Sequence, residues 1–196
     1  MLDLILLIKK MKYLKKHWSS ILFGFFIILM IIPETRIPVQ VFLQRTISLS
    51  PSEIKKENRT VLKEYDWKLS DLHSNNVNLS VSKDKVILIN FWATWCSPCI
   101  AEIPAFQDLY NFYKDKVDFY FITNDKSEKI KLFLNNKGYD IPVFRPLEKS
   151  PNVLTSKSLP TTFLISKKGE IIIKKVGVAS WNSDKVHQII KGLLAK

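Results

Sequence analysis

The stretch VILINFWATWCSPCIAEIP, residues 86–104, decides the fold of this chain. It opens with an unbroken apolar run, Val86–Trp92, whose β-branched and aromatic side chains are typical of a buried strand. The chain then reaches Cys96-Ser97-Pro98-Cys99. Pro98 favours a helix that begins there, because a first-turn residue needs no amide hydrogen for the helix ladder. The stretch therefore predicts a strand that leads, through two cysteines, into a helix.

Two cysteines at the start of a helix are suited to redox chemistry. A sulfur beside a helix N-terminus faces unpaired amide hydrogens and the positive end of the helix dipole, which favour its anionic form. The thiolate is the species that attacks a disulfide, so we expect Cys96 to be the nucleophile. Cys99 lies one turn further along the helix, close enough to resolve a mixed disulfide. We therefore interpret the pair as a redox-active disulfide.

A structural disulfide and half of a zinc site are the alternatives. A zinc site of the usual kind needs four ligands, and the chain has no second CxxC motif; its histidines, His17, His73 and His187, are scattered. Haem attachment needs a histidine directly after the second cysteine, and that position is Ile100. Redox chemistry is favoured, and we expect neither a metal nor another cofactor.

These motifs together resemble the membrane-anchored TlpA/ResA group of thioredoxin-like proteins. The resemblance rests on FWATWCSPC at 91–99, AEIP at 101–104, LPTTF at 159–163 and KGE at 168–170, and it extends over about residues 65–194. Thioredoxin itself has an acidic residue six positions before the first cysteine, where this chain has Asn90. The TlpA/ResA pattern instead has a glutamate six positions after it, which here is Glu102.

The resemblance implies roles for Glu102, Leu159 and Pro160. Glu102 would take the proton of Cys99, whereas its spacing alone also suits an exposed carboxylate that helps the helix dipole. Pro160 would follow a cis peptide bond and pack against the disulfide, and Leu159 would offer its backbone to an extended substrate strand. Because Trp95 lies next to the nucleophile, we expect it to shield Cys96 and contact partners. Without the resemblance, Pro160 is an ordinary loop proline.

The net charge of +12 is spread over the chain. Residues 1–60 contain ten Lys or Arg against four Asp or Glu, and residues 61–196 contain twenty against fourteen, so each part contributes +6. In the second part the lysines alternate with acidic residues and form no long basic stripe. This pattern favours a solvated basic surface over nucleic-acid binding.

The N-terminal part predicts a membrane anchor. Trp18–Ile32 is an uncharged apolar run, shorter than a comfortable span unless Tyr13, Leu14 and the neighbouring lysines extend it. A cleaved signal peptide is the alternative, although no suitable small residues follow the run. Translation could start at Met1 or at Met11. Because five lysines precede the run, the N-terminus is expected in the cytoplasm and the rest outside, in the periplasm or at the cell exterior.

Three parts of the chain follow from this pattern: a tail and anchor at 1–33, a juxtamembrane linker at 34–60 and a domain at 61–196. Short strands are expected at 66–69, 77–81, 141–145, 162–166 and 170–176, with buried strands at 86–92 and 117–123. Helices are expected after Cys96 and at 127–137 and 181–195. This order predicts an α/β fold with a thioredoxin-like mixed sheet, covered on both faces and flanked by helices.

The combined prediction is a single-pass enzyme of the cytoplasmic membrane that exchanges thiols and disulfides. The anchored relatives suggest a reductant of protein disulfides that receives electrons from a membrane thiol reductase, with a role in cytochrome c maturation. A disulfide-forming oxidant and a non-catalytic metal-binding module that uses the CxxC motif are the alternatives.

Overall fold

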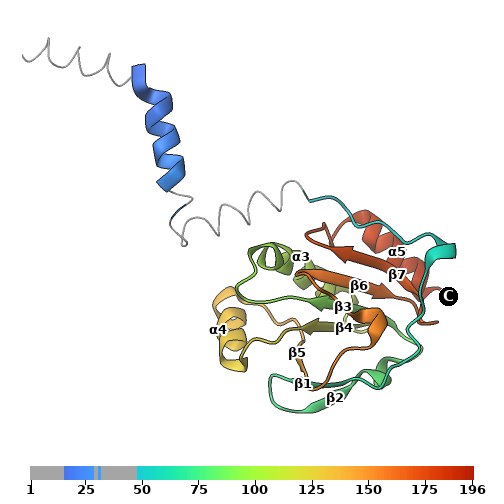
Figure 1. Cartoon of the computed structure of the whole chain (residues 1–196). Coiled ribbons are helices and arrows are strands. Elements are labelled where there is room, and N and C mark those ends of the chain that lie inside the picture. Colours follow the sequence, from blue (N-terminus) through green and yellow to red (C-terminus); the bar gives the residue numbers. More distant parts are fainter. Residues whose placement is uncertain (1–15, 29–30, 32–47) are drawn as a thin grey trace, which may run out of the picture. The chain divides into compact units, whose positions relative to one another are not determined.

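The computed structural model describes residues 16–28, 31 and 48–196 (Figure 1). The chain divides into two units, residues 1–40 and 41–196. In the first unit, residues 16–28 form a helix whose apolar side chains, Trp18 and Phe25 among them, are exposed. Within the described residues, no helix has both the length and the apolar character needed to cross a membrane. The remaining predictions for residues 1–15, 29–30 and 32–47 lie outside the described residues.

A seven-stranded mixed sheet forms the centre of the second unit. Its strands are β1 (Lys68–Asp71), β2 (Asn76–Asn78), β3 (Val86–Phe91), β4 (Val117–Ile122), β5 (Val143–Pro146), β6 (Thr161–Ile165) and β7 (Ile171–Val176). They lie in the order β2-β1-β5-β4-β3-β6-β7. β3 and β4 pair in parallel, as do β4 and β5, and the other neighbours are antiparallel. The predicted mixed sheet is confirmed.

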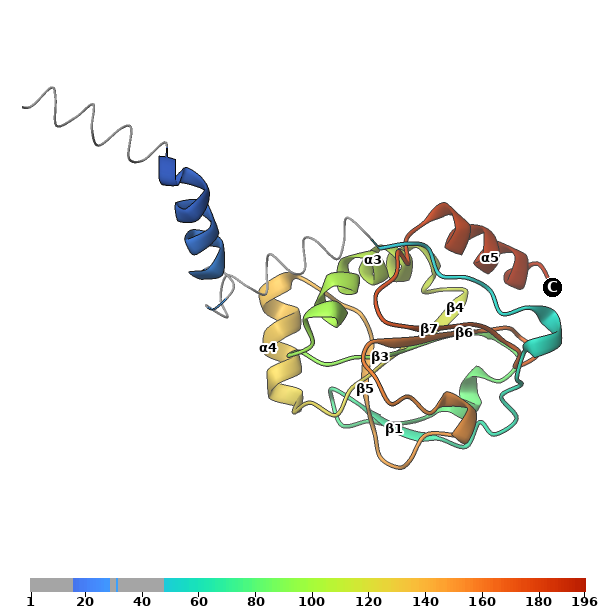
Figure 2. The same ribbon diagram turned by 45° about the horizontal axis from the view of Figure 1, so that its top comes forward.

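Three α-helices pack on one face of this sheet: α3 (Ser97–Tyr113), α4 (Ser127–Lys137) and α5 (Asp184–Leu194) (Figure 2). The crossovers through α3 and α4 move along the sheet in the same direction. Right-handed crossovers therefore place both helices on the same side. Val86 and Leu88 face these helices, whereas Ile87 and Ile89 face the other core.

The opposite face of the sheet is covered as well, as predicted. In the described part of the chain it is covered by short 3₁₀ turns, η2 (Leu79–Ser82) and η3 (Asn152–Leu154), and by the buried side chains of Leu62 and Trp67. The strand expected at 77–81 therefore ends early. Its end is fixed by Asn78, whose side chain accepts a hydrogen bond from the amide of Ser80 and caps η2.

Other predicted elements agree with the structure, with shifted ends. The helix expected at 127–137 is α4, and Gly138 ends it with a φ of 67°, a left-handed conformation that glycine adopts without strain. The last helix begins at Asp184, three residues later than predicted. Trp181 therefore belongs to the segment between β7 and α5, where it is fully buried.

Part of the segment assigned to the linker lies against the domain. The amide of Ile54 donates to the carbonyl of Ile172 at 2.7 Å, and the amide of Ser180 donates to the carbonyl of Leu49 at 3.0 Å. Both views show this segment, in teal, running beside β7 and α5 (Figures 1 and 2). Residues 48–60 thus pack on the domain before the predicted boundary at residue 61. The boundary itself stays a prediction.

Candidate active site

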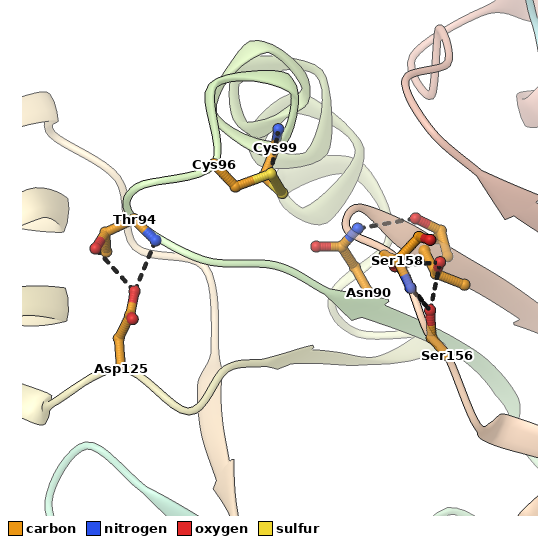
Figure 3. The surroundings of a disulfide bond; sticks show 9 residues. Asn90, Thr94, Cys96, Cys99, Asp125, Ser156 and Ser158 are labelled. Carbon is orange, nitrogen blue, oxygen red and sulfur yellow. Dashed lines mark hydrogen bonds between the residues drawn. A yellow bond between two sulfur atoms is a disulfide. The ribbon is translucent and has the colours of Figure 1, made fainter.

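Cys96 and Cys99 are joined by a disulfide at the N-terminus of α3 (Figure 3). Cys96 is the N-cap residue, and its Sγ accepts a hydrogen bond from the amide of Cys99 at 3.3 Å. Cys96 is 6% exposed and Cys99 is 1% exposed. A helix amide therefore contacts the sulfur of Cys96, which is the more exposed residue of the two. This geometry suits Cys96 as the attacking thiolate.

The loop before the disulfide is held by Asp125. Its Oδ2 accepts hydrogen bonds from the amide of Thr94 at 2.7 Å and from the Thr94 hydroxyl at 2.8 Å (Figure 3). Trp95, the next residue, is 66% exposed beside the first cysteine. The loop is therefore anchored at Thr94, and it presents an aromatic side chain to solvent next to the disulfide.

Asn90 lies on the face of β3 that carries α3, because it continues the alternation of Val86 and Leu88. Its Nδ2 donates to the hydroxyl of Thr162 on β6 at 2.8 Å. Its Oδ1 is buried and has no hydrogen-bond partner among the described residues. Figure 3 shows the side chain below the start of α3, with the amide nitrogen turned toward β6.

The Leu159–Pro160 peptide bond is cis, as the resemblance implies. Antiparallel pairing of Phe91 with Thr161 brings Pro160 alongside the residues that follow β3 and lead to Cys96. Pro160 is buried, whereas Leu159 is 36% exposed. The loop before this bond is closed by the hydroxyls of Ser156 and Thr161, which lie 2.7 Å apart and within 2.8 Å of the carbonyl oxygen of Ser158 (Figure 3).

Glu102 is almost fully buried, at 2% exposure. The alternative of an exposed helix carboxylate is therefore wrong. Its Oε1 accepts hydrogen bonds from the amide of Ala179 and from the indole Nε1 of Trp181, both at 2.8 Å. Its Oε2 is buried and has no hydrogen-bond partner among the described residues.

Burial raises the pKa of Glu102 from its ordinary value of 4.5 to about 8. The two hydrogen bonds and the positive charge of Lys175 oppose this rise, because they stabilise the ionised carboxylate. Glu102 follows Cys99 by three residues on α3, so the two side chains occupy neighbouring positions on the helix surface. A carboxyl group whose pKa is near neutrality is suited to accept and return a proton.

Comparisons with known proteins agree with this chemistry. The profile of the AhpC/TSA family matches residues 63–174, more than half of the chain. The chain belongs to the AhpC/TSA family.

Two curated relatives are about one third identical to the chain over the aligned residues. A thiol-disulfide oxidoreductase ResA of Bacillus cereus is 34% identical over 128 residues, which cover 62% of this chain and 73% of the relative. The thioredoxin-like protein YneN of Bacillus subtilis is 32% identical over 130 residues, which cover 63% of this chain and 74% of YneN. The resemblance to ResA is thereby confirmed, and the chain is a thiol-disulfide oxidoreductase.

A solved structure shows the same fold. A secreted thiol-disulfide isomerase from Corynebacterium glutamicum superposes with a TM-score of 0.57 at 18% identity, covering 74% of this chain and 91% of that one. At this identity the likeness concerns the fold alone. The thioredoxin-like α/β fold predicted from the sequence is thus confirmed.

Three contacts of the site were not predicted, those of Asp125 with Thr94 and of Ala179 and Trp181 with Glu102. Asp125 could have been found, because it follows β4 closely and the carboxyl ends of parallel neighbours such as β3 and β4 meet at one edge of a sheet. Trp181 and Ala179 lie almost 80 residues from Glu102 in the chain. No local pattern pairs them with it.

Proposed function

We propose that this enzyme is a membrane-anchored reductant of protein disulfides, in which Cys96 attacks and Cys99 resolves. The observation that carries the proposal is the unequal surroundings of the two sulfurs. Cys96 is the more exposed residue, and its sulfur accepts a hydrogen bond from a helix amide, whereas Cys99 is buried on the same helix as Glu102. Protein disulfides are the substrates that this arrangement serves.

The reaction starts from the reduced dithiol. The Cys96 thiolate attacks one sulfur of a substrate disulfide, a Cys96–substrate disulfide forms, and one substrate sulfur leaves as a thiolate. Cys99 then loses its proton to Glu102, attacks the Cys96 sulfur and displaces the second substrate thiolate. The enzyme ends as the Cys96–Cys99 disulfide, and two electrons have passed to the substrate. A membrane thiol reductase would restore the dithiol.

Glu102 would make the second step possible at neutral pH. Its pKa of about 8 leaves roughly a tenth of the carboxyl groups ionised at pH 7, and this ionised form can receive the proton of a buried thiol. A surface cavity of about 360 Å³ borders Glu102, Ala105 and Ser180, and water in it could later remove the proton.

Trp95, Leu159 and Pro160 would form the substrate surface. Trp95 and Leu159 are both exposed; Trp95 directly precedes Cys96, and Leu159 directly precedes the buried cis proline. An extended substrate segment could pair with the backbone of Leu159 and contact the indole of Trp95.

The membrane position is part of the same proposal. The exposed apolar side chains of helix 16–28 support an anchor, since an apolar helix surface of this kind needs an apolar environment. Lysines before the run favour a cytoplasmic N-terminus and a domain in the periplasm or at the cell exterior. The Corynebacterium neighbour is described as secreted, which agrees with export. Cytochrome c maturation is the process we propose for its substrates.

The reduction potential of the Cys96–Cys99 pair tests the direction of electron flow. A potential below about −220 mV is expected for a reductant, whereas a value near about −120 mV would indicate a disulfide-forming oxidant. The assay is equilibration with glutathione or dithiothreitol buffers, followed by alkylation of the free thiols. An oxidising value would overturn the proposed direction and leave the thiol-exchange chemistry in place.

The other candidate is a metal-binding module that uses the CxxC motif. The described residues contain no group of three or more His, Cys, Asp or Glu side chains that could hold a metal ion. Zinc retained after gel filtration, together with no thiol-exchange turnover, would favour this candidate.

A further inference from the structure

The two oxygens of Glu102 have different surroundings. Oε1 accepts two N–H donors, from Ala179 and Trp181, each at 2.8 Å. Oε2 has no partner within the part of the chain that the structure describes. A carboxylate oxygen that already accepts two hydrogen bonds has little capacity left for a proton. When Glu102 is protonated, the proton therefore belongs on Oε2.

The indole of Trp181 is held in place by packing. The residue is fully buried, and its ring stacks on Phe106, with the centroids 5.3 Å apart and the planes at 23°. Phe106 follows Glu102 by four residues, so both lie on neighbouring positions of α3. The same helix therefore carries the ring that packs on the indole and the carboxylate that accepts the indole hydrogen bond. The indole N–H cannot turn away without breaking this packing.

The segment that carries both donors is also tied down at its middle residue. The amide of Ser180 donates to the carbonyl of Leu49 at 3.0 Å, and its hydroxyl donates to the carbonyl of Ser48 at 2.8 Å. The backbone of residues 48 and 49 therefore holds the segment through hydrogen bonds to Ser180, and the buried indole of Trp181 holds it through packing in the core. Three consecutive residues, 179–181, form a rigid support behind Glu102.

We propose that Trp181 is a positioning residue of this enzyme, which with the amide of Ala179 binds Oε1 of Glu102 and leaves Oε2 as the single oxygen that exchanges a proton. This rests on the proposed role of Glu102 toward Cys99. In the resolving step the Cys99 Sγ–H bond breaks and an Oε2–H bond forms on Glu102, with no change in oxidation state. The indole favours the ionised carboxylate and so keeps Glu102 able to accept this proton near neutral pH.

The charged groups near Glu102 permit a clear test. Lys175 of β7 lowers the pKa of Glu102. Asp108 of α3 lines the surface cavity that borders Glu102, and its carboxylate accepts a hydrogen bond from Asn182. Neither contacts the indole nitrogen in the structure. Replacing Trp181 with phenylalanine therefore removes one donor to the carboxylate and retains these charges.

The test is Trp181→Phe in the full chain, followed by ¹³C NMR titration of the Glu102 carboxyl group and by the pH profile of disulfide reduction. The titration midpoint is expected to rise by about one pH unit, because a donor to the charged form is lost. The alkaline shift should appear in the activity profile as well. In a Glu102→Gln background, Trp181→Phe should leave the activity profile unchanged.

Trp67→Phe is the matched control. Trp67 is also fully buried, and its indole donates to the carbonyl of Glu148 in the core on the other face of the sheet. It should lower stability to urea without moving the Glu102 midpoint. An unmoved midpoint in Trp181→Phe, or an equal shift in Trp67→Phe, overturns the proposal.

Two outcomes separate this proposal from the proposed function. If the carboxyl midpoint moves and the activity profile does not, Trp181 positions Glu102 but Glu102 does not serve Cys99. If Trp181→Phe fails to fold, a pH titration of the indole ¹⁵N–H signal of Trp181 in the wild-type chain takes the place of the variant experiment. That signal should titrate with the midpoint of the Glu102 carboxyl group, and an indole signal that does not titrate would refute the contact.

Discussion

The carboxylate of Asp125 accepts two hydrogen bonds from Thr94, one from the amide at 2.7 Å and one from the hydroxyl at 2.8 Å. Asp125 follows β4 and Thr94 follows β3, so this pair joins the carboxyl ends of two parallel neighbours. Cys96 comes two residues after Thr94. The contact therefore fixes the loop that delivers the first sulfur to the start of α3.

Asp125→Ala should destabilise the domain by about 1–3 kcal/mol, because a partly buried amide and hydroxyl lose a charged acceptor. It should also speed hydrogen exchange at the Thr94 amide. Urea unfolding and exchange NMR measure the two effects. Thr94→Val is the control: it keeps the bond from the amide and should lose less stability. Equal losses in the two variants would show that the amide bond contributes nothing.

Glu102→Gln should change how stability depends on pH. The pKa of Glu102 is 4.5 ordinarily and about 8 in the folded chain. Between these values the folded chain binds a proton that the unfolded chain has released, so the wild type loses stability as pH rises from about 4.5 to 8. The loss is at most on the order of 5 kcal/mol.

The glutamine variant retains an acceptor for Ala179 and Trp181 and has no charge to desolvate. The free energy of unfolding of the variant, relative to that of the wild type, should therefore increase as the pH rises through this window. Above about pH 8 the difference between the two should stay constant. Urea titrations at several pH values between 4 and 9 measure this difference. A constant difference across the window would mean that Glu102 titrates near its ordinary pKa.

The two cysteines should behave differently when replaced by serine. Cys96→Ser should abolish reduction of disulfides, because it removes the nucleophile. Cys99→Ser should retain the attack but not the resolution, and should accumulate mixed disulfides with substrates. Non-reducing gels of cell extracts, compared with the double variant, display these species. Comparable trapping by both single variants would refute the assignment of roles.

The predicted anchor can be tested in the full-length chain. The protein should fractionate with membranes and resist extraction by alkaline carbonate. Phe25→Lys places a charge in the middle of the apolar run and opposes insertion by roughly 3 kcal/mol, so it should increase the extracted fraction. A soluble product shortened at its N-terminus would support the signal peptide instead.

Local patterns were sufficient for the centre of the fold. An apolar run predicted β3, Pro98 and the spacing after it predicted the start of α3, and a glycine predicted the end of α4. Each of these signals acts over a few residues, through side-chain alternation, capping or backbone freedom. The resemblance added the cis bond before Pro160, which the structure contains.

Contacts between distant segments escaped the same reasoning. The sequence predicted a sheet covered on both faces and flanked by helices, but it did not say which face each helix covers. The direction of the two successive crossovers places α3 and α4 on one face, and α5 packs in the same core. The sequence also left open whether Glu102 was exposed, because a glutamate on a helix has the same local pattern in either case.

The sequence by itself determined the redox motif, the strand and helix that hold it, and the order of the two cysteines on that helix. Only the tertiary structure decided the environment of the carboxylate that accompanies them. Burial behind α3 raises the pKa of Glu102, and its two donors come from Ala179 and Trp181, brought there when β7 pairs with β6 and α5 packs on the sheet. A proton affinity depends on such surroundings, and the residues that supply them lie far apart in the chain.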